Sequence, residues 1–263
     1  MARKANRSAN HSQKVSSNRN NSNRRSNRKQ EVIVNEDENS FKREKKKTIE
    51  LIPRSINQES LLFALEDRTK HIVFAIGPAG SGKTILSTRY AVKQLKEQKI
   101  DKIVISRPNI AVDDKDIGFL PGDITSKMAP WTRPIIAEME EFFTKQEIEY
   151  MIKEDIIEIL PLAFIRGRTL KNSVILLDEA QNTTPTSLLS AMTRIGENSK
   201  MIVTGDIRQS DRPNIKNGLV DFLKRYEQFP SNKMSVIRFD NKDVQRHPVI
   251  VDVLNMYSDL DIG

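Results

Sequence analysis

Short apolar runs alternate with longer amphipathic stretches through the chain after residue 50. The runs are rich in Ile, Val and Leu and too short for helices, so they predict buried strands at 71–76, 102–106, 155–160, 173–177, 200–204 and 235–239. Between them, apolar residues at helical spacing predict helices at 59–65, 85–92, 135–143, 146–153, 184–195, 218–226 and 249–257. This alternation predicts an α/β fold with a mainly parallel sheet and helices on both faces.

The N-terminal 30 residues have a different composition from the rest of the chain. They contain nine Arg and Lys residues, seven Asn, six Ser and no acidic residue, whereas the net charge of the whole chain is only +8. With no apolar periodicity, residues 1–30 are expected to form a disordered basic arm that binds nucleic-acid phosphates. A solubilising tail and an arm that docks on an acidic protein are the alternatives. Residues 31–50 read as a charged linker, and 51–263 as a single folded domain.

Composition narrows the chemistry. The chain has no cysteine and three scattered histidines, which excludes disulfides, thiolate catalysis and cysteine-ligated zinc. Chemistry is therefore expected from carboxylates, hydroxyls and Mg²⁺. No apolar run approaches the length of a membrane span, and no apolar stretch follows the basic N-terminus as it would in a signal peptide. We expect a cytoplasmic protein with no membrane partner, which would lie in the host cytoplasm if a bacteriophage encodes it.

The segment after the first predicted strand fits the phosphate-binding loop pattern G-x-x-x-x-G-K-[ST] at every fixed position. Its residues are Gly77, Pro78, Ala79, Gly80, Ser81, Gly82, Lys83 and Thr84. Backbone N–H groups of such a loop surround an anion, and the N-terminus of the following helix adds partial positive charge. Lys83 is expected to reach the β- and γ-phosphates, and the Thr84 hydroxyl to bind Mg²⁺. The pattern predicts ATP and Mg²⁺ as cofactors.

Gln58 has two interpretations. Ser55 and Gln58 have the spacing of a helix capping box, which would give the glutamine a structural role. A glutamine about twenty residues before a phosphate loop also suits recognition of adenine, because its amide offers one donor and one acceptor. The sequence leaves both roles open.

Two further strands bring polar residues to the carboxyl edge of the sheet. Asp178 and Glu179 follow the run at 173–177, so Asp178 is expected to hold Mg²⁺ and Glu179 to polarise the attacking water. After the strand at 200–204, Gln209 is a candidate sensor of the γ-phosphate, and Asp206 would orient that phosphate or the water.

Several arginines are candidates for phosphate or nucleic-acid contact. The proline-rich connection at 109–134 carries Trp131 and follows Arg107, a combination that suits stacking of single-stranded bases. Arg166 and Arg168 flank a glycine before the strand at 173–177 and would hold a phosphate. Arg246 is a candidate arginine finger across a subunit boundary. Trp131 as a packing anchor, solvated surface arginines and a helix-capping role for Arg246 are the alternatives.

Taken together, the motifs resemble the PhoH-like proteins, phosphate-starvation-associated ATPases related to superfamily 1 helicases. The motifs are the phosphate loop, Ser106-Arg107-Pro108, 118–123, 166–169, 178–184, Thr204-Gly205-Asp206 and Arg246-His247-Pro248. The resemblance covers about residues 50–258. It implies one RecA-like ATPase domain that acts on RNA or single-stranded DNA, in some members as a hexameric ring.

By position, the resemblance assigns adenine reading to Gln58, phosphate and metal contacts to Lys83 and Thr84, and γ-phosphate sensing to Gln209. It assigns metal binding to Asp178 and contact with the attacking water to Glu179. We therefore expect a Mg²⁺-dependent, helicase-like ATPase coupled to nucleic acid, assembled as a ring because one RecA-like lobe cannot close over ATP alone. The alternative is a slow nucleotide-gated switch that recruits a protein partner through the arm.

Overall fold

The computed structural model describes residues 49–108, 124–210 and 216–245, together with Val249 and Met256. The predicted arm at 1–30, nearly all of the predicted linker at 31–50, Arg246 and most of the predicted helix at 249–257 lie outside the described residues.

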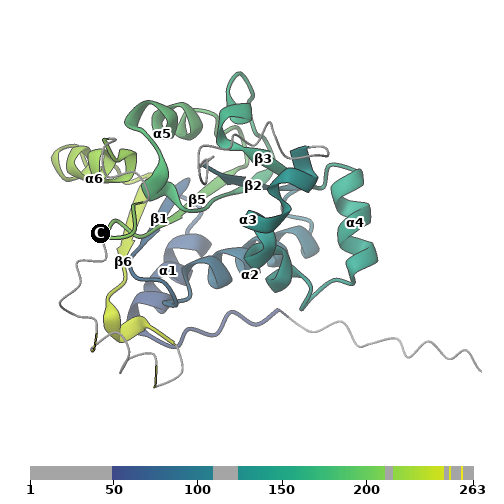
Figure 1. Cartoon of the computed structure of the whole chain (residues 1–263), viewed down its shortest axis with the longest axis horizontal. Coiled ribbons are helices and arrows are strands. Elements are labelled where there is room, and N and C mark those ends of the chain that lie inside the picture. The colour runs from purple at the N-terminus through teal and green to yellow at the C-terminus, as the bar shows by residue number, and fades with distance from the viewer. Residues whose placement is uncertain (1–48, 109–123, 211–215, 246–248, 250–255, 257–263) are drawn as a thin grey trace, which may run out of the picture. The chain divides into compact units, whose positions relative to one another are not determined.

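The fold is built on one six-stranded sheet in which every strand pairing is parallel (Figure 1). The strand order is β3-β2-β4-β5-β1-β6. In chain order the strands are β1 (Ile72–Ile76), β2 (Lys102–Arg107), β3 (Ile157–Pro161), β4 (Ser173–Leu177), β5 (Lys200–Gly205) and β6 (Met234–Arg238). The predicted strands and the parallel sheet are confirmed. Because β5 lies between β1 and β4, the ends of these three strands meet at one edge.

Helices cover both faces of this sheet (Figure 1). They are α1 (Ile56–Glu66), α2 (Lys83–Lys96), α3 (Ile124–Met139), α4 (Lys145–Lys153), α5 (Pro185–Met192) and α6 (Gly218–Gln228). Side chains of α1 to α4 share one buried cluster with the sheet, and those of α5 and α6 share another. This is the predicted RecA-like α/β architecture. None of the described helices is both long and apolar enough to cross a membrane.

The pleat of the strands divides their side chains between the two clusters. In β1, Val73 and Ala75 join the cluster that includes α1 and α2, whereas Ile72, Phe74 and Ile76 join the cluster that includes α5 and α6. All five residues of β1 are buried. An uninterrupted apolar run is therefore the sequence that a strand covered on both faces requires.

The prediction of a long connection at 109–134 is wrong from residue 124 onward, because helix α3 begins at Ile124. This helix contains Pro130 and Pro134. A proline inside a helix removes one backbone hydrogen bond. Here the cost is offset by a buried face at helical spacing, formed by Met128, Thr132, Ile135 and Met139, each at most 2% exposed. Tertiary burial has overridden the local preference.

Candidate nucleotide-binding site

The loop at 77–82 joins the end of β1 to the start of α2, as predicted. Gly77, Gly80 and Gly82 have φ angles of 145°, 83° and 88°. At Gly77 a β-carbon would lie 2.4 Å from the carbonyl oxygen of Phe239, so the close approach of this neighbouring segment requires glycine. Gly82 is the N-cap of α2 and provides no side-chain hydrogen bond, which leaves the first N–H groups of the helix for an anion.

Lys83 lies against its own loop. Its Nζ donates to the carbonyl oxygens of Gly77 and Pro78, both at 2.7 Å, and lies 3.3 Å from Ser81 Oγ. The side chain is buried. The loop therefore holds a positive charge at the place where the sequence predicts phosphates.

Gln58 fixes α1 to the same loop. Its Nε2 donates to the carbonyl oxygen of Ser81 at 2.9 Å, and its Oε1 accepts from the N–H of Arg54 at 2.8 Å. Ser55 is the N-cap of α1, and its hydroxyl accepts from the Gln58 N–H at 3.2 Å. The glutamine side chain reaches Arg54 rather than the Ser55 N–H, so only half of the capping box forms. Adenine recognition by Gln58 stays a prediction.

Asp178 stands at the end of β4 between two hydroxyls. Thr84 Oγ1 lies 3.4 Å from Asp178 Oδ1, and Thr204 Oγ1 donates to the same oxygen. The Asp178 N–H donates to the carbonyl oxygen of Ser106 at 3.0 Å, which fixes the chain where β4 and β2 end. Sequence reasoning assigned no role to Thr204, although the residue belongs to a quoted motif.

Glu179 adopts a left-handed backbone conformation, with φ 55°. Its Oε1 lies 3.4 Å from Arg107 Nη2, and its Oε2 accepts from Gln181 Nε2. Arg107 also donates from Nη1 to the carbonyl oxygen of Trp131 at 2.9 Å. In this structure the predicted nucleic-acid contact Arg107 therefore links the predicted water-activating residue to α3.

These residues border one cavity of about 220 Å³. It is lined by the phosphate loop, Thr84, Asp178, Glu179, Asp206 and Gln209 among others. The Asp206 N–H donates to Gln181 Oε1 at 3.1 Å, and the Gln209 N–H donates to the Asp206 carbonyl oxygen at 3.1 Å. The turn after β5 is thus connected to the turn that carries Glu179. The sequence-predicted residues from three strand ends meet here.

The segment that precedes Arg246 also reaches the phosphate loop, because the Gln245 N–H donates to the Gly80 carbonyl oxygen at 2.9 Å. Buried Asp243 secures this segment: its Oδ2 accepts from Asn57 Nδ2 at 2.8 Å and from the Asp240 N–H at 2.7 Å. Burial opposes ionisation of Asp243, but hydrogen bonds from Ser55, Asn57 and the Asp240 N–H outweigh it and lower its pKa. Arg246 itself lies outside the described residues.

The other predicted nucleic-acid residues are Trp131, Arg166 and Arg168. Trp131 is partly buried and packs against the core. Arg168 is engaged by Glu158 through two hydrogen bonds of 2.6 and 2.9 Å, whereas Arg166 is exposed. Burial opposes ionisation of Glu158, but the bonds from Arg168 and Lys102 outweigh it and lower its pKa. Nucleic-acid contact by these residues stays a prediction.

Comparison with known proteins identifies the family. Residues 50–258 match the model for the PhoH-like protein family. The chain belongs to this family. A PhoH-like protein of Bacillus subtilis (strain 168) is 42% identical over 190 residues, which is 71% of this chain and 58% of that protein. Protein PhoH of Escherichia coli (strain K12) is 37% identical over 219 residues, 82% of this chain and 60% of that protein.

The PhoH-like chain thus spans less than two thirds of the length of these relatives. Among solved structures, the large terminase of a thermophilic bacteriophage has a TM-score of 0.49 and 14% identity. That match covers 78% of this chain and 51% of the terminase chain.

Proposed function

We propose that this PhoH-like chain binds ATP with Mg²⁺ and hydrolyses it. The observation that carries the proposal is the meeting of Lys83, Thr84, Asp178 and Glu179 at one cavity beside a glycine-rich loop. A lysine, a hydroxyl and two carboxylates in this order match the groups that phosphoryl transfer to water requires.

The donors for a metal ion fit this proposal. Thr84 Oγ1 and Asp178 Oδ1 are 3.4 Å apart, and a hydroxyl with a carboxylate is the oxygen donor set that Mg²⁺ prefers. When bound there, Mg²⁺ would offset negative charge on the phosphate oxygens. Thr204, which donates to Asp178 Oδ1, would hold the carboxylate in its orientation.

Two side chains would change partners when ATP binds. Lys83 now donates to loop carbonyls, which are weaker acceptors than a phosphate, so its ammonium would turn to the β- and γ-phosphates. Glu179 is now bound to Arg107 and Gln181, and it would accept a proton from the attacking water only after release from at least one of them. Hydrolysis would thus depend on how readily Glu179 exchanges its contacts with Arg107 and Gln181.

We also propose that hydrolysis is coupled to RNA or single-stranded DNA. The nine cationic residues of 1–30 and exposed Arg166 supply the positive charge that phosphodiester binding needs. The described residues form one sheet, so a lobe that closes over ATP would come from a neighbouring copy in a ring, with Arg246 or Arg208 reaching its site. A slow nucleotide switch that recruits a protein through 1–30 is the alternative.

The test is steady-state ATP hydrolysis by the wild type and Glu179→Gln, with and without single-stranded RNA or DNA, at low and moderate salt. We expect Glu179→Gln to hydrolyse ATP about 100-fold more slowly while keeping its ATP affinity, because only the carboxylate that accepts the proton is lost. Glu149→Gln, an exposed position on α4, is the matched control and should behave as wild type.

If nucleic acid stimulates ATP hydrolysis by the wild type but not by Glu179→Gln, the coupled ATPase is supported. The polymer that raises the rate more, RNA or single-stranded DNA, would then be identified as the nucleic acid on which the protein acts. Slow hydrolysis that neither polymer changes would favour the switch. Equal rates in wild type and Glu179→Gln would contradict the role of Glu179 and, with it, the proposed chemistry.

A further inference from the structure

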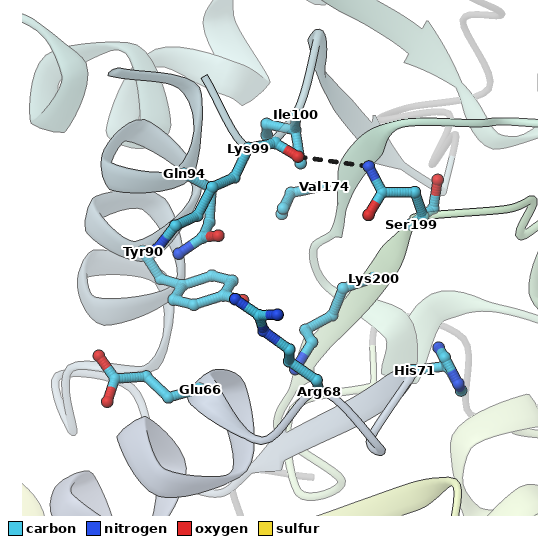
Figure 2. Close-up of a pocket in the computed structure, with 11 residues that line it drawn as sticks. Glu66, Arg68, His71, Tyr90, Gln94, Lys99, Ile100, Val174, Ser199 and Lys200 are labelled. Atoms are coloured by element: carbon cyan, nitrogen blue, oxygen red, sulfur yellow. Dashed lines mark hydrogen bonds between the residues drawn. The ribbon is translucent and has the colours of Figure 1, made fainter. Parts of the chain in front are cut away.

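A second cavity, of about 290 Å³, lies at the edge of the sheet where the strands begin, opposite the phosphate loop, and Figure 2 shows the residues that line it. It is bordered by residues at or just before the starts of strands, such as His71, Val174 and Lys200. The ends of α1 and α2 supply the rest of the lining, with Glu66, Arg68, Tyr90 and Gln94. None of the residues proposed for ATP chemistry lines this cavity.

The carbonyl groups at the ends of both helices are already bonded. Buried Lys200 donates from Nζ to the carbonyl oxygens of Leu65, Asp67 and Ala64 at 2.5, 2.8 and 3.3 Å, which closes the end of α1. At the end of α2, the carbonyl oxygens of Lys93, Leu95 and Gln94 accept from the N–H groups of the next residues, 97–99. The helix ends therefore offer little competition for donors that face the cavity.

Tyr90 is the strongest indication of a ligand. The residue is only 6% exposed and lines the cavity, yet its hydroxyl makes no hydrogen bond to the residues that the structure describes. Burial raises the pKa of Tyr90 to about 12, so the hydroxyl is a donor at neutral pH. Among the described residues, the buried side-chain atoms without a hydrogen-bond partner are Ser106 Oγ and Arg194 Nε, so the Tyr90 hydroxyl is open to the cavity, where a ligand or water can bond it.

Two neighbouring side chains, those of Arg68 and Gln94, have N–H groups that could donate hydrogen bonds to a ligand. In Figure 2 the Arg68 guanidinium lies near the hydroxyl end of Tyr90, and the Gln94 amide lies next to the Tyr90 ring. After burial, the negative charge of Glu66 is the next largest cause that raises the pKa of Tyr90, and the positive charge of Arg68 acts in the opposite direction with a smaller effect. Neither the Arg68 nor the Gln94 side chain makes a hydrogen bond or ion pair with another described residue. The nearby acid Glu66 is paired with Lys93 Nζ at 3.1 Å.

We propose that this cavity binds an oxyanion of the phosphate class, held by Arg68, the Tyr90 hydroxyl and the Gln94 amide. Arg68 presents the planar pair of N–H donors that matches two phosphate oxygens, and the two neutral donors reach the remaining oxygens. Lys200 adds positive charge although its three hydrogens face carbonyls. The proposal does not rest on ATP hydrolysis.

The test measures the binding of inorganic phosphate to the full chain by calorimetric titration. All variants also carry Lys83→Ala, which disables the phosphate loop. We expect binding to persist in Lys83→Ala and to weaken by about tenfold on adding Arg68→Gln, because a charged donor is lost. Adding Tyr90→Phe, which keeps the buried ring, should weaken it about threefold to tenfold. Arg225→Gln, which removes the same charge from an exposed position on α6, should change nothing.

The proposal is overturned if phosphate binding disappears with Lys83→Ala, or if Arg68→Gln and Tyr90→Phe leave it unchanged. Arg68 is exposed, so Arg68→Gln keeps the test valid if Tyr90→Phe folds poorly. Competition in Lys83→Ala then identifies the source of the phosphate. Displacement by a short single-stranded RNA would indicate a phosphodiester, and displacement by glycerol phosphate alone would indicate a monoester.

Discussion

Two buried lysines stand at opposite edges of the same sheet, and both donate to backbone carbonyls. Lys83 at the carboxyl edge donates to Gly77 and Pro78 of the phosphate loop. Lys200 at the amino edge donates to Ala64, Leu65 and Asp67 at the end of α1. The two residues are 8% and 9% exposed. Burial and hydrogen bonding alone therefore do not distinguish the lysine proposed to act on ATP from one that only stabilises the fold.

The acceptors make the difference. The loop carbonyls at Lys83 lie beside a cavity that also contains Asp178 and Glu179, so water could replace the lysine when its ammonium turns to a phosphate. Of the carbonyls at Lys200, those of Ala64 and Leu65 belong to the last turn of α1, where the helix provides no backbone donor, whereas the Asp67 carbonyl also accepts from the Lys70 N–H at 3.2 Å. Losing Lys200 would leave the Ala64 and Leu65 carbonyls without partners, whereas Lys83 is held by contacts it can exchange. We expect function at the first lysine and stability at the second.

The largest expected effect follows from removing Lys83. Lys83→Ala should slow ATP hydrolysis by about 100-fold or more, because the charge that offsets developing charge on the phosphates is lost. Its free energy of unfolding should fall by only about 1 kcal/mol or less, since the loop carbonyls can bond to water. Steady-state hydrolysis and urea unfolding measure the two quantities. Lys153→Ala, at an exposed position on α4, is the control. If Lys83→Ala hydrolysed ATP at the wild-type rate, the functional role expected for Lys83 would be contradicted.

Lys200→Met should show the opposite pattern. Methionine keeps the apolar stem but leaves the Ala64 and Leu65 carbonyls at the end of α1 without a donor, so the free energy of unfolding should fall by about 2 to 3 kcal/mol. Hydrolysis per folded molecule should stay within a factor of about two, because the site at the other edge keeps all its groups. Unchanged stability with lost hydrolysis would mean that Lys200 acts on the nucleotide site.

The same contrast explains what the sequence could predict. Lys83 was identified because the phosphate loop is a continuous pattern between a strand and a helix, and Asp178 because a carboxylate follows a buried strand. The sequence did not identify Lys200, because its hydrogen-bond partners at 64–67 are more than 130 positions away and no local pattern indicates them. The Arg107–Glu179 contact and the prolines inside α3 were likewise decided by tertiary packing.

The smallest expected effect is the dependence of the free energy of unfolding on pH through Lys200. Burial lowers the pKa of Lys200 from its ordinary 10.5 to about 8, although the nearby Asp67 acts in the opposite direction. Below about pH 8 both the folded and the unfolded chain carry the proton, so this group adds no slope. Between about pH 8 and 10.5 the unfolded chain binds more protons, so the free energy of unfolding should rise with pH, by at most about 1.4 kcal/mol per pH unit.

Other lysines titrate in wild type and Lys200→Met alike, so the difference in unfolding free energy between these two proteins isolates Lys200. Measured by urea unfolding at pH 7, 8, 9 and 10, that difference should be flat at first and then widen in favour of the wild type. Two effects compete here: burial favours the neutral amine, and the three carbonyls favour the ammonium. A difference that stays flat up to pH 10 would show that the carbonyls prevail and that folded Lys200 keeps its charge over this range.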